Sequence, residues 1–192
     1  GRDEFTYYQG LVRIPEGAAP DTKNRSWQIK AELDIPEGGA EGVLLTHGGR
    51  FSGWGLYLLE GRPVFCYNLA GVARYTIAGK DALAPGTHTV VYDFKYDGPG
   101  LGKGCVGTIQ VDGTTVATGR IERTLAFRPS LDETLDCGED TGTPVAEDYL
   151  NKMPFKFTGD LRKVVLSLGK SGLTASDERT LDEGRKIAAL RD

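Results

Sequence analysis

The sequence predicts an all-β protein, an antiparallel β-sandwich or jelly roll that ends in a short helix. Apolar and polar residues alternate in several short segments, and turns rich in Gly, Pro and Asp separate these segments. A series of short strands with no helix between them is typical of a sandwich. We expect the sandwich to occupy residues 1–172 and a helical tail to occupy residues 173–192.

The clearest strand is "SWQIKAELDI", in which Trp27, Ile29, Ala31, Leu33 and Ile35 alternate with polar residues. A period of two places these apolar side chains on one face of a half-buried strand. The segments "HTVVYDFKY" and "RKVVLSL" repeat this alternation later in the chain. They predict two further strands of the same kind.

Three turns are predicted from local residues. Glu60-Gly61 and Asp112-Gly113 each separate two strand-like runs, as in a tight hairpin. The glycine-rich "HGGR", His47–Arg50, has two readings, a phosphate-binding loop or a turn. A phosphate loop leads into a helix, but the next residues, "FSGWGLYLL", continue as a strand, so we predict a turn.

The last segment, "LTASDERTLDEGRKIAALRD", predicts a helix. Thr174 or Ser176 is a suitable N-cap, with acidic residues in the first turn and basic residues later. Gly184 weakens the pattern.

Composition limits the partners. The chain has 192 residues and a net charge of −4, which argues against nucleic acid. Its apolar runs are too short to cross a membrane. The chain begins "GRDEF" without methionine or a signal peptide. We expect a processed piece of a longer protein, with its compartment, periplasm or cytoplasm, left open.

The sequence predicts no catalytic residue. The chain has two histidines and lacks a G-x-S-x-G motif. Cys66, Cys105 and Cys137 are far apart and form no C-x-x-C pair. They predict free thiols, with one disulfide and one thiol as the alternative.

An acidic segment between Ser130 and Tyr149 is a candidate metal site. Asp132, Asp136, Glu139 and Asp140 supply the oxygen ligands that calcium prefers, which makes calcium the candidate cofactor. Their spacing does not fit an EF-hand. The alternative is a solvated loop whose Asp side chains cap their own turns.

The aromatic residues have two possible fates. The alternation places Trp27 in the core. Trp54, Tyr149 and the pair Tyr7-Tyr8 lie near turns, where an exposed ring would stack on a sugar. The alternative is that these rings pack in the core or at an interface.

Motifs such as "APDTKNRS", "GGAEGVLLTHGGRFSGW" and "GEDTGTPV" give the chain a resemblance to a known family. It resembles the C-terminal region of large bacterial arylsulfatases, which implies a β-sandwich of the concanavalin-A/laminin-G kind that follows a catalytic domain. That family's nucleophile lies in a C/S-x-P-x-R motif, which this chain lacks. The resemblance therefore implies a module that is not an enzyme on its own.

The resemblance further implies a partner, the sulfatase catalytic domain of the same parent chain. The module would pack on that domain, shaping substrate access or oligomer contacts, with His47, Arg50 and Trp54 as candidate ligand or interface residues. The alternative is a lectin-like carbohydrate-binding module with a glycan as partner. A third reading is a hydrolase that uses the acidic segment. A cluster of exposed aromatic side chains on one face would favour glycan binding, whereas buried aromatic side chains together with an exposed apolar patch would favour docking.

Overall fold

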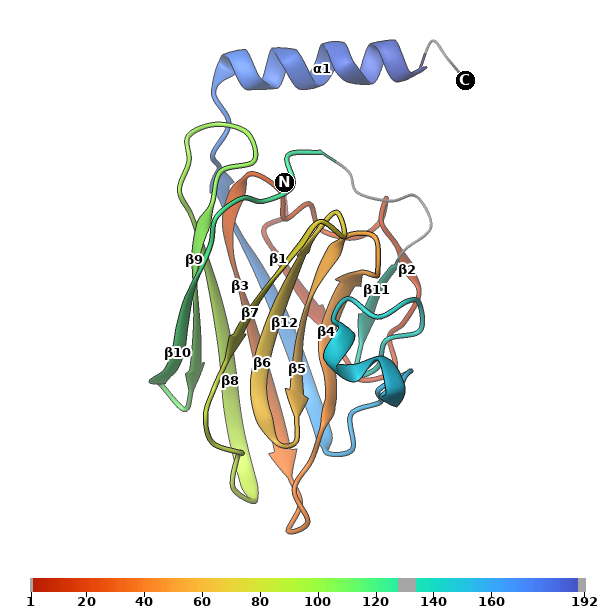
Figure 1. The fold of residues 1–192 in the computed structure, drawn as a ribbon, viewed down its shortest axis with the longest axis vertical. Coiled ribbons are helices and arrows are strands. Elements are labelled where there is room, and N and C mark those ends of the chain that lie inside the picture. The colour runs from red at the N-terminus through yellow and green to blue at the C-terminus, as the bar shows by residue number, and fades with distance from the viewer. Residues whose placement is uncertain (1, 128–133, 190–192) are drawn as a thin grey trace.

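Twelve strands in the described residues form two six-stranded antiparallel sheets that pack face to face (Figure 1). The computed structural model describes residues 2–127 and 134–189. Sheet A has the order β1 (Glu4–Tyr7), β12 (Asp160–Ser171), β3 (Arg25–Ile35), β8 (Gly86–Tyr96), β9 (Cys105–Val111) and β10 (Thr114–Ile121). Sheet B has the order β2 (Ile14–Pro15), β11 (Thr134–Cys137), β4 (Gly42–Gly48), β5 (Gly53–Leu59), β6 (Arg62–Leu69) and β7 (Ala73–Ala78). The predicted sandwich is confirmed.

The core lies between the two sheets and contains the apolar face predicted for residues 27–35. The five apolar side chains of that strand are at most 4% exposed. Aromatic rings fill the centre. The Trp27 ring lies 4.7 Å from that of Phe94 and 4.8 Å from that of Trp54, and the Phe65 and Tyr92 rings stack at 3.6 Å. Stacked and tilted pairs of this kind add to the stability that burial alone provides.

The predicted hairpin turns are confirmed by their backbone angles. Glu60 and Gly61 have φ values of 51° and 78°, and Asp112 and Gly113 have values of 51° and 81°. Two successive positive φ values give the turn whose twist matches the flanking strands.

The "HGGR" motif forms the turn between β4 and β5, as predicted. Gly48 and Gly53 face each other across its base, with φ values of 90° and 148°. A Cβ on Gly48 would lie 2.2 Å from the carbonyl oxygen of Ser52, and one on Gly53 would lie 2.2 Å from that of His47. Only glycine fits both positions, because the two strands approach too closely for a side chain.

A second apolar cluster covers the outer face of sheet B. The segment after β11 crosses this face and contains the 3₁₀ helix η1 (Glu147–Lys152), drawn in teal in Figure 1. It packs its own apolar side chains on those of the sheet; the cluster consists of Val43, Tyr57, Val64, Cys66, Val145, Ala146, Tyr149 and Phe155. We call residues 138–158 the covering segment.

The predicted terminal helix is confirmed as α1 (Ala175–Ala189), which extends from one end of the sandwich (Figure 1). Thr174 is its cap. The backbone N–H of Asp177 donates to Thr174 Oγ1 at 3.2 Å, and the N–H of Thr174 donates to the Asp177 carboxylate at 2.8 Å. This reciprocal pair is a capping box. In residues 2–127 and 134–189, no helix has the length and apolar character needed to cross a membrane.

The three cysteines are free and buried. Burial raises the pKa of each thiol to about 12. A thiol that stays protonated and inaccessible is a packing group rather than a nucleophile.

Candidate functional site

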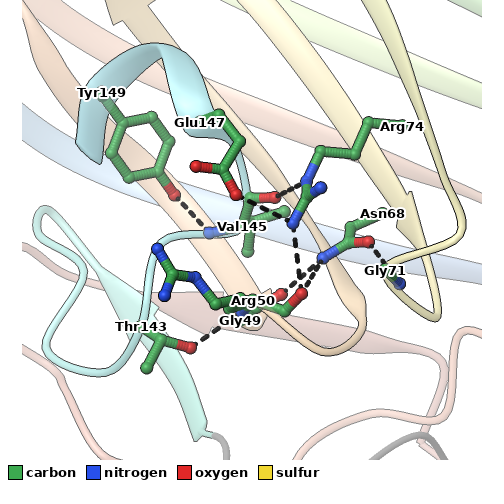
Figure 2. Close-up of polar contacts among 9 residues, drawn as sticks. All are labelled: Gly49, Arg50, Asn68, Gly71, Arg74, Thr143, Val145, Glu147 and Tyr149. Carbon is green, nitrogen blue, oxygen red and sulfur yellow. Dashed lines mark hydrogen bonds and ion pairs between the residues drawn. The ribbon is translucent and has the colours of Figure 1, made fainter.

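A network of hydrogen bonds joins three segments at one end of sheet B (Figure 2). They are the β4–β5 turn, the β6–β7 turn and part of the covering segment. We call this network the loop site; it consists of Gly49, Arg50, Asn68, Gly71, Arg74, Thr143, Val145 and Glu147.

Asn68, at the end of β6, is the centre of the loop site. Its side chain is fully buried, and its Nδ2 donates to the carbonyl oxygens of Gly49 and Arg50, both at 2.8 Å. Its Oδ1 accepts from the backbone N–H of Gly71 at 3.0 Å. A buried amide that is satisfied in this way is costly to break, so it fixes the two turns relative to each other.

Arg74, on β7, connects the β4–β5 turn to the covering segment. Its Nε donates to the carbonyl oxygen of Val145 and its Nη2 to that of Arg50, both at 3.2 Å. The Nη2 also lies 3.3 Å from a carboxylate oxygen of Glu147. The guanidinium has several donors in a fixed plane, which suits a residue that bridges three partners.

The backbone of Arg50 is fixed by hydrogen bonds, whereas its side chain has no partner within the described residues. Its N–H donates to Thr143 Oγ1 at 2.8 Å, and its carbonyl oxygen accepts the two bonds described above. Figure 2 shows the guanidinium turned away from these bonds. Within the described residues it has no hydrogen bond or ion pair, and the side chain is exposed. The loop site therefore presents one cation from a rigid support.

Two large apolar side chains are exposed on the same pair of turns. Phe51, next to Arg50, is 68% exposed, and Val72, next to Gly71, is 87% exposed. A guanidinium binds a carboxylate or sulfate through two parallel hydrogen bonds, and an aromatic ring packs on the apolar face of a sugar. Together they suit a ligand that combines an anionic group with an apolar face.

Of the candidate residues His47, Arg50 and Trp54, only Arg50 is exposed. Trp54 is 3% exposed, and its Nε1 donates to Thr22 Oγ1 at 3.2 Å. His47 is opposite Trp54 in the β4–β5 register, with the two rings 5.8 Å apart. Of the two fates left open for Trp54, the structure shows core packing, because the register turns this side chain into the core.

The other aromatic residues with two possible fates divide between them. Tyr149 is fully buried and Tyr7 is 7% exposed, whereas Tyr8 is 55% exposed. The Tyr149 hydroxyl donates to Asp140 Oδ2 at 2.7 Å and accepts from the N–H of Val145 at 3.0 Å. The Tyr149 hydroxyl therefore stabilises the covering segment and is not available to a ligand.

Of the candidate calcium ligands, the three that the structure describes are buried or half-buried. Asp132 lies outside the described residues. Asp136 and Asp140 are 2% and 1% exposed, and Glu139 is half-buried. Asp136 accepts hydrogen bonds from both the N–H and the hydroxyl of Thr141, each at 2.6 Å.

Among the described residues, no three His, Cys, Asp or Glu side chains form a group that could hold a metal. Asp136 and Asp140 instead accept hydrogen bonds from donors of the chain itself. Calcium binding at a set that includes Asp132 stays a prediction.

Asn68, Arg74 and Thr143 were missed by the sequence analysis. They come from β6, β7 and the covering segment, and no local pattern connects them. The one available signal was a polar residue at the end of an otherwise apolar run, "PVFCYNL". Such a residue commonly holds a turn.

No family model and no curated protein matches this chain. Solved structures do share its fold. The chain is similar to the CBM40 module of the IT-sialidase of Ruminococcus gnavus bound to α2,6-sialyllactose, with a TM-score of 0.60 and 13% identity over 85% of this chain and 91% of that one. For the same module without a named ligand, the TM-score is 0.57 and the identity 14%, over 93% and 94% of the two chains.

The resemblance to arylsulfatases is therefore wrong, together with the descriptions arylsulfatase and hydrolase that followed from it. The structures described above are carbohydrate-binding modules of a sialidase, and they give no support to a sulfatase domain. The quoted motifs lie in the segment that leads into β3, in the hairpin from β4 to β5 and in the covering segment. These parts build the sandwich, so they carry information about its fold and none about a parent enzyme. What is shown is an all-β antiparallel sandwich of two sheets, followed by a C-terminal helix, and this fold is shared with the CBM40 modules.

Proposed function

We propose that this chain is a carbohydrate-binding module without a catalytic step, and that its loop site binds a glycan through an acidic sugar. The observation that carries the proposal is the uncommitted guanidinium of Arg50 on a backbone held by Asn68, Arg74 and Thr143. The shared fold supports it, because the similar modules are described with sialyllactose bound.

The geometry favours an acidic ligand over a neutral one. The Arg50 backbone is fixed by hydrogen bonds at both N–H and C=O, so a ligand need only order the side chain. Glu147 lies against Arg74 and offsets that charge, which leaves Arg50 as the cation that a ligand can use. The exposed ring of Phe51 supplies an apolar surface beside it.

Titration calorimetry with sialyllactose, lactose and sulfated lactose tests the proposal. We expect sialyllactose to bind and lactose to bind at least about tenfold more weakly, because a charge-assisted pair is worth about 1.5 kcal/mol or more. Arg50→Ala should remove this preference, and Arg50→Lys should restore it in part because lysine keeps the charge but not the planar fork.

Arg179→Ala is the matched control. Arg179 is an exposed arginine on α1 and, within the described residues, has no hydrogen bond or ion pair. Its removal changes the net charge equally and should leave binding unchanged. Equal affinity for lactose and sialyllactose, or an equal loss in both variants, would contradict the proposed role of Arg50.

A further inference from the structure

The outer face of sheet A carries a groove at a distance from the loop site. The groove has a volume of about 550 Å³, within the range of ligand pockets in proteins. It lies over β12, β3, β8 and β9, and its polar lining includes Gln28, Asp93, Lys95, Thr108, Gln110 and Ser167. The loop site and the covering segment belong to sheet B, so the two sites lie on different sheets.

The strand register arranges the centre of this lining as a row. Ser167 pairs with Gln28, Gln28 with Asp93, and Asp93 with Thr108. Residues that pair in this way point to the same face of a sheet. Four adjacent strands thus place an unbroken line of polar side chains across the groove.

Most of the hydrogen-bonding capacity of this row is unused. Gln28 Nε2 donates to Asp93 Oδ1 at 2.7 Å. Within the described residues, Asp93 Oδ2 and Gln28 Oε1 accept no hydrogen bond, and the polar groups of Thr108, Gln110 and Lys95 have no partner among the described side chains. All of them are half-buried or exposed, so a ligand can reach them.

The chemistry of the groove differs from that of the loop site. It combines acceptors on Asp93 and Gln28 with donors on Gln110 and Lys95, and Thr108 does both. Sugar hydroxyls also donate and accept, so they match such a mixture. One carboxylate and one ammonium leave the lining without net charge, and Val106, which is 36% exposed, adds an apolar surface. An uncharged ligand is favoured, since an anion would be repelled by Asp93 and a cation by Lys95, whereas hydroxyl groups can hydrogen-bond to both side chains.

We propose that this groove is a second glycan site, and that it binds a neutral oligosaccharide along the row from Ser167 to Thr108. The proposal uses none of the residues of the loop site and stands or falls separately from the function proposed for that site. With both sites active, the chain would hold two parts of a glycan surface at once and gain avidity.

Side-chain amide signals in a ¹H–¹⁵N NMR titration give a direct test. The chain has three glutamines, Gln9, Gln28 and Gln110. Gln28 and Gln110 line the groove, whereas Gln9 donates to the Phe157 carbonyl and accepts from the Leu161 N–H. Gln9 therefore serves as an internal control.

The probes are neutral hexasaccharides of glucose, mannose, galactose and xylose, added to about 10 mM, which detects even millimolar dissociation constants. We expect at least one to shift the Gln28 and Gln110 signals and leave Gln9 unchanged. Asp93→Asn, which keeps the shape but removes the charge, should weaken binding about five- to tenfold. Arg50→Ala should have no effect on this binding.

Two results would overturn the second site. One is that no hexasaccharide moves the two groove signals at the highest concentration. The other is that the shifts map to the loop site and vanish in Arg50→Ala, which would leave the proposed function intact and reject the groove. Binding at the groove without binding of acidic sugars at Arg50 would keep the second site and reject the function proposed for the loop site.

Discussion

The two sheets differ most on their outer faces. On sheet B, the outer side chains of Val43 and Tyr57 are fully buried under the covering segment. On sheet A, the outer side chains of Gln28, Asp93 and Thr108 stay accessible. A strand that is covered on one side alternates, and a strand that is covered on both sides reads as a continuous apolar run. The outer face of sheet B therefore contributes to stability, whereas the outer face of sheet A remains available to ligands.

The largest effect should follow from removing the contact between the covering segment and sheet B. Tyr149 is fully buried and packs its ring 5.0 Å from Tyr57 and 5.1 Å from Phe155. We expect Tyr149→Ala to lower the free energy of unfolding by about 3 to 5 kcal/mol, as for other large aromatic truncations. Urea unfolding followed by fluorescence measures it. A loss below about 1 kcal/mol would mean that the segment adds little to sheet B.

Asn68 connects the stability of sheet B to the loop site. Asn68→Ala removes three hydrogen bonds and leaves the carbonyl of Gly49 buried without its side-chain donor. We expect a loss of about 2 to 3 kcal/mol in the free energy of unfolding. Acidic-sugar affinity, measured by calorimetry on the folded fraction, should also fall because Arg50 loses its support. Unchanged affinity would show that the fixed backbone is not needed for binding.

These differences explain what the sequence could predict. The alternation in residues 27–35 sufficed for sheet A, because one of its faces meets solvent. Hairpin turns at Glu60-Gly61 and Asp112-Gly113 were equally predictable, since their backbone angles depend on local residues. For Trp54 and Tyr149 the sequence left exposure and burial both open. Their neighbours in sequence are glycines and polar residues, whereas their burial depends on strand register and on the covering segment.

The candidate site was less predictable than the fold. Arg50 was recognised from its motif, but the residues that fix it come from other segments, as with Asn68 and Arg74. The polar row from Ser167 to Thr108 has the same property, because it exists only once four strands are aligned. The local sequence pattern predicts which side chains of one strand lie on the same face. The register between strands decides which side chains of neighbouring strands lie side by side on that face.

The same substitution on the two outer faces sharpens the comparison. Val64, on sheet B, is 4% exposed in the second cluster, and Val91, on sheet A, is half-buried in register with Lys30 and Gln110. Val→Thr keeps the shape and adds a hydroxyl. We expect Val64→Thr to cost about 1 to 2 kcal/mol, because its hydroxyl is buried, and Val91→Thr to stay within about 0.5 kcal/mol. Equal losses of unfolding free energy, measured by urea unfolding, would mean that the two outer faces exclude water equally.

The smallest effect concerns the pH dependence of the unfolding free energy. It involves His88, on β8, which contacts the β9–β10 turn of sheet A. His88 Nδ1 lies 2.7 Å from Asp112 Oδ2, and Nε2 lies 2.8 Å from the carbonyl oxygen of Ala84. Burial alone lowers the pKa of His88, but the hydrogen bonds to Asp112 and Ala84 together raise it above its usual value. The hydrogen bond from the Thr89 N–H lowers the pKa of Asp112 most; burial opposes it, and the contact with His88 lowers the pKa further, so that the net shift is downward.

The sign of the pH dependence follows from these directions. The stabilisation from charged His88 is complete below the unfolded pKa of about 6.5 and is lost as pH rises through the higher folded pKa. The contribution of Asp112 is present above about pH 4 and is lost as pH falls. The difference in unfolding free energy between the native chain and His88→Gln should therefore be largest between about pH 4.5 and 6, and should shrink towards pH 8. Thermal unfolding across this range measures it, with Gln110→Ala on the outer face of the same sheet as control. A difference that grows towards pH 8 would show that His88 is held neutral, and would assign the Asp112 contact to a neutral imidazole.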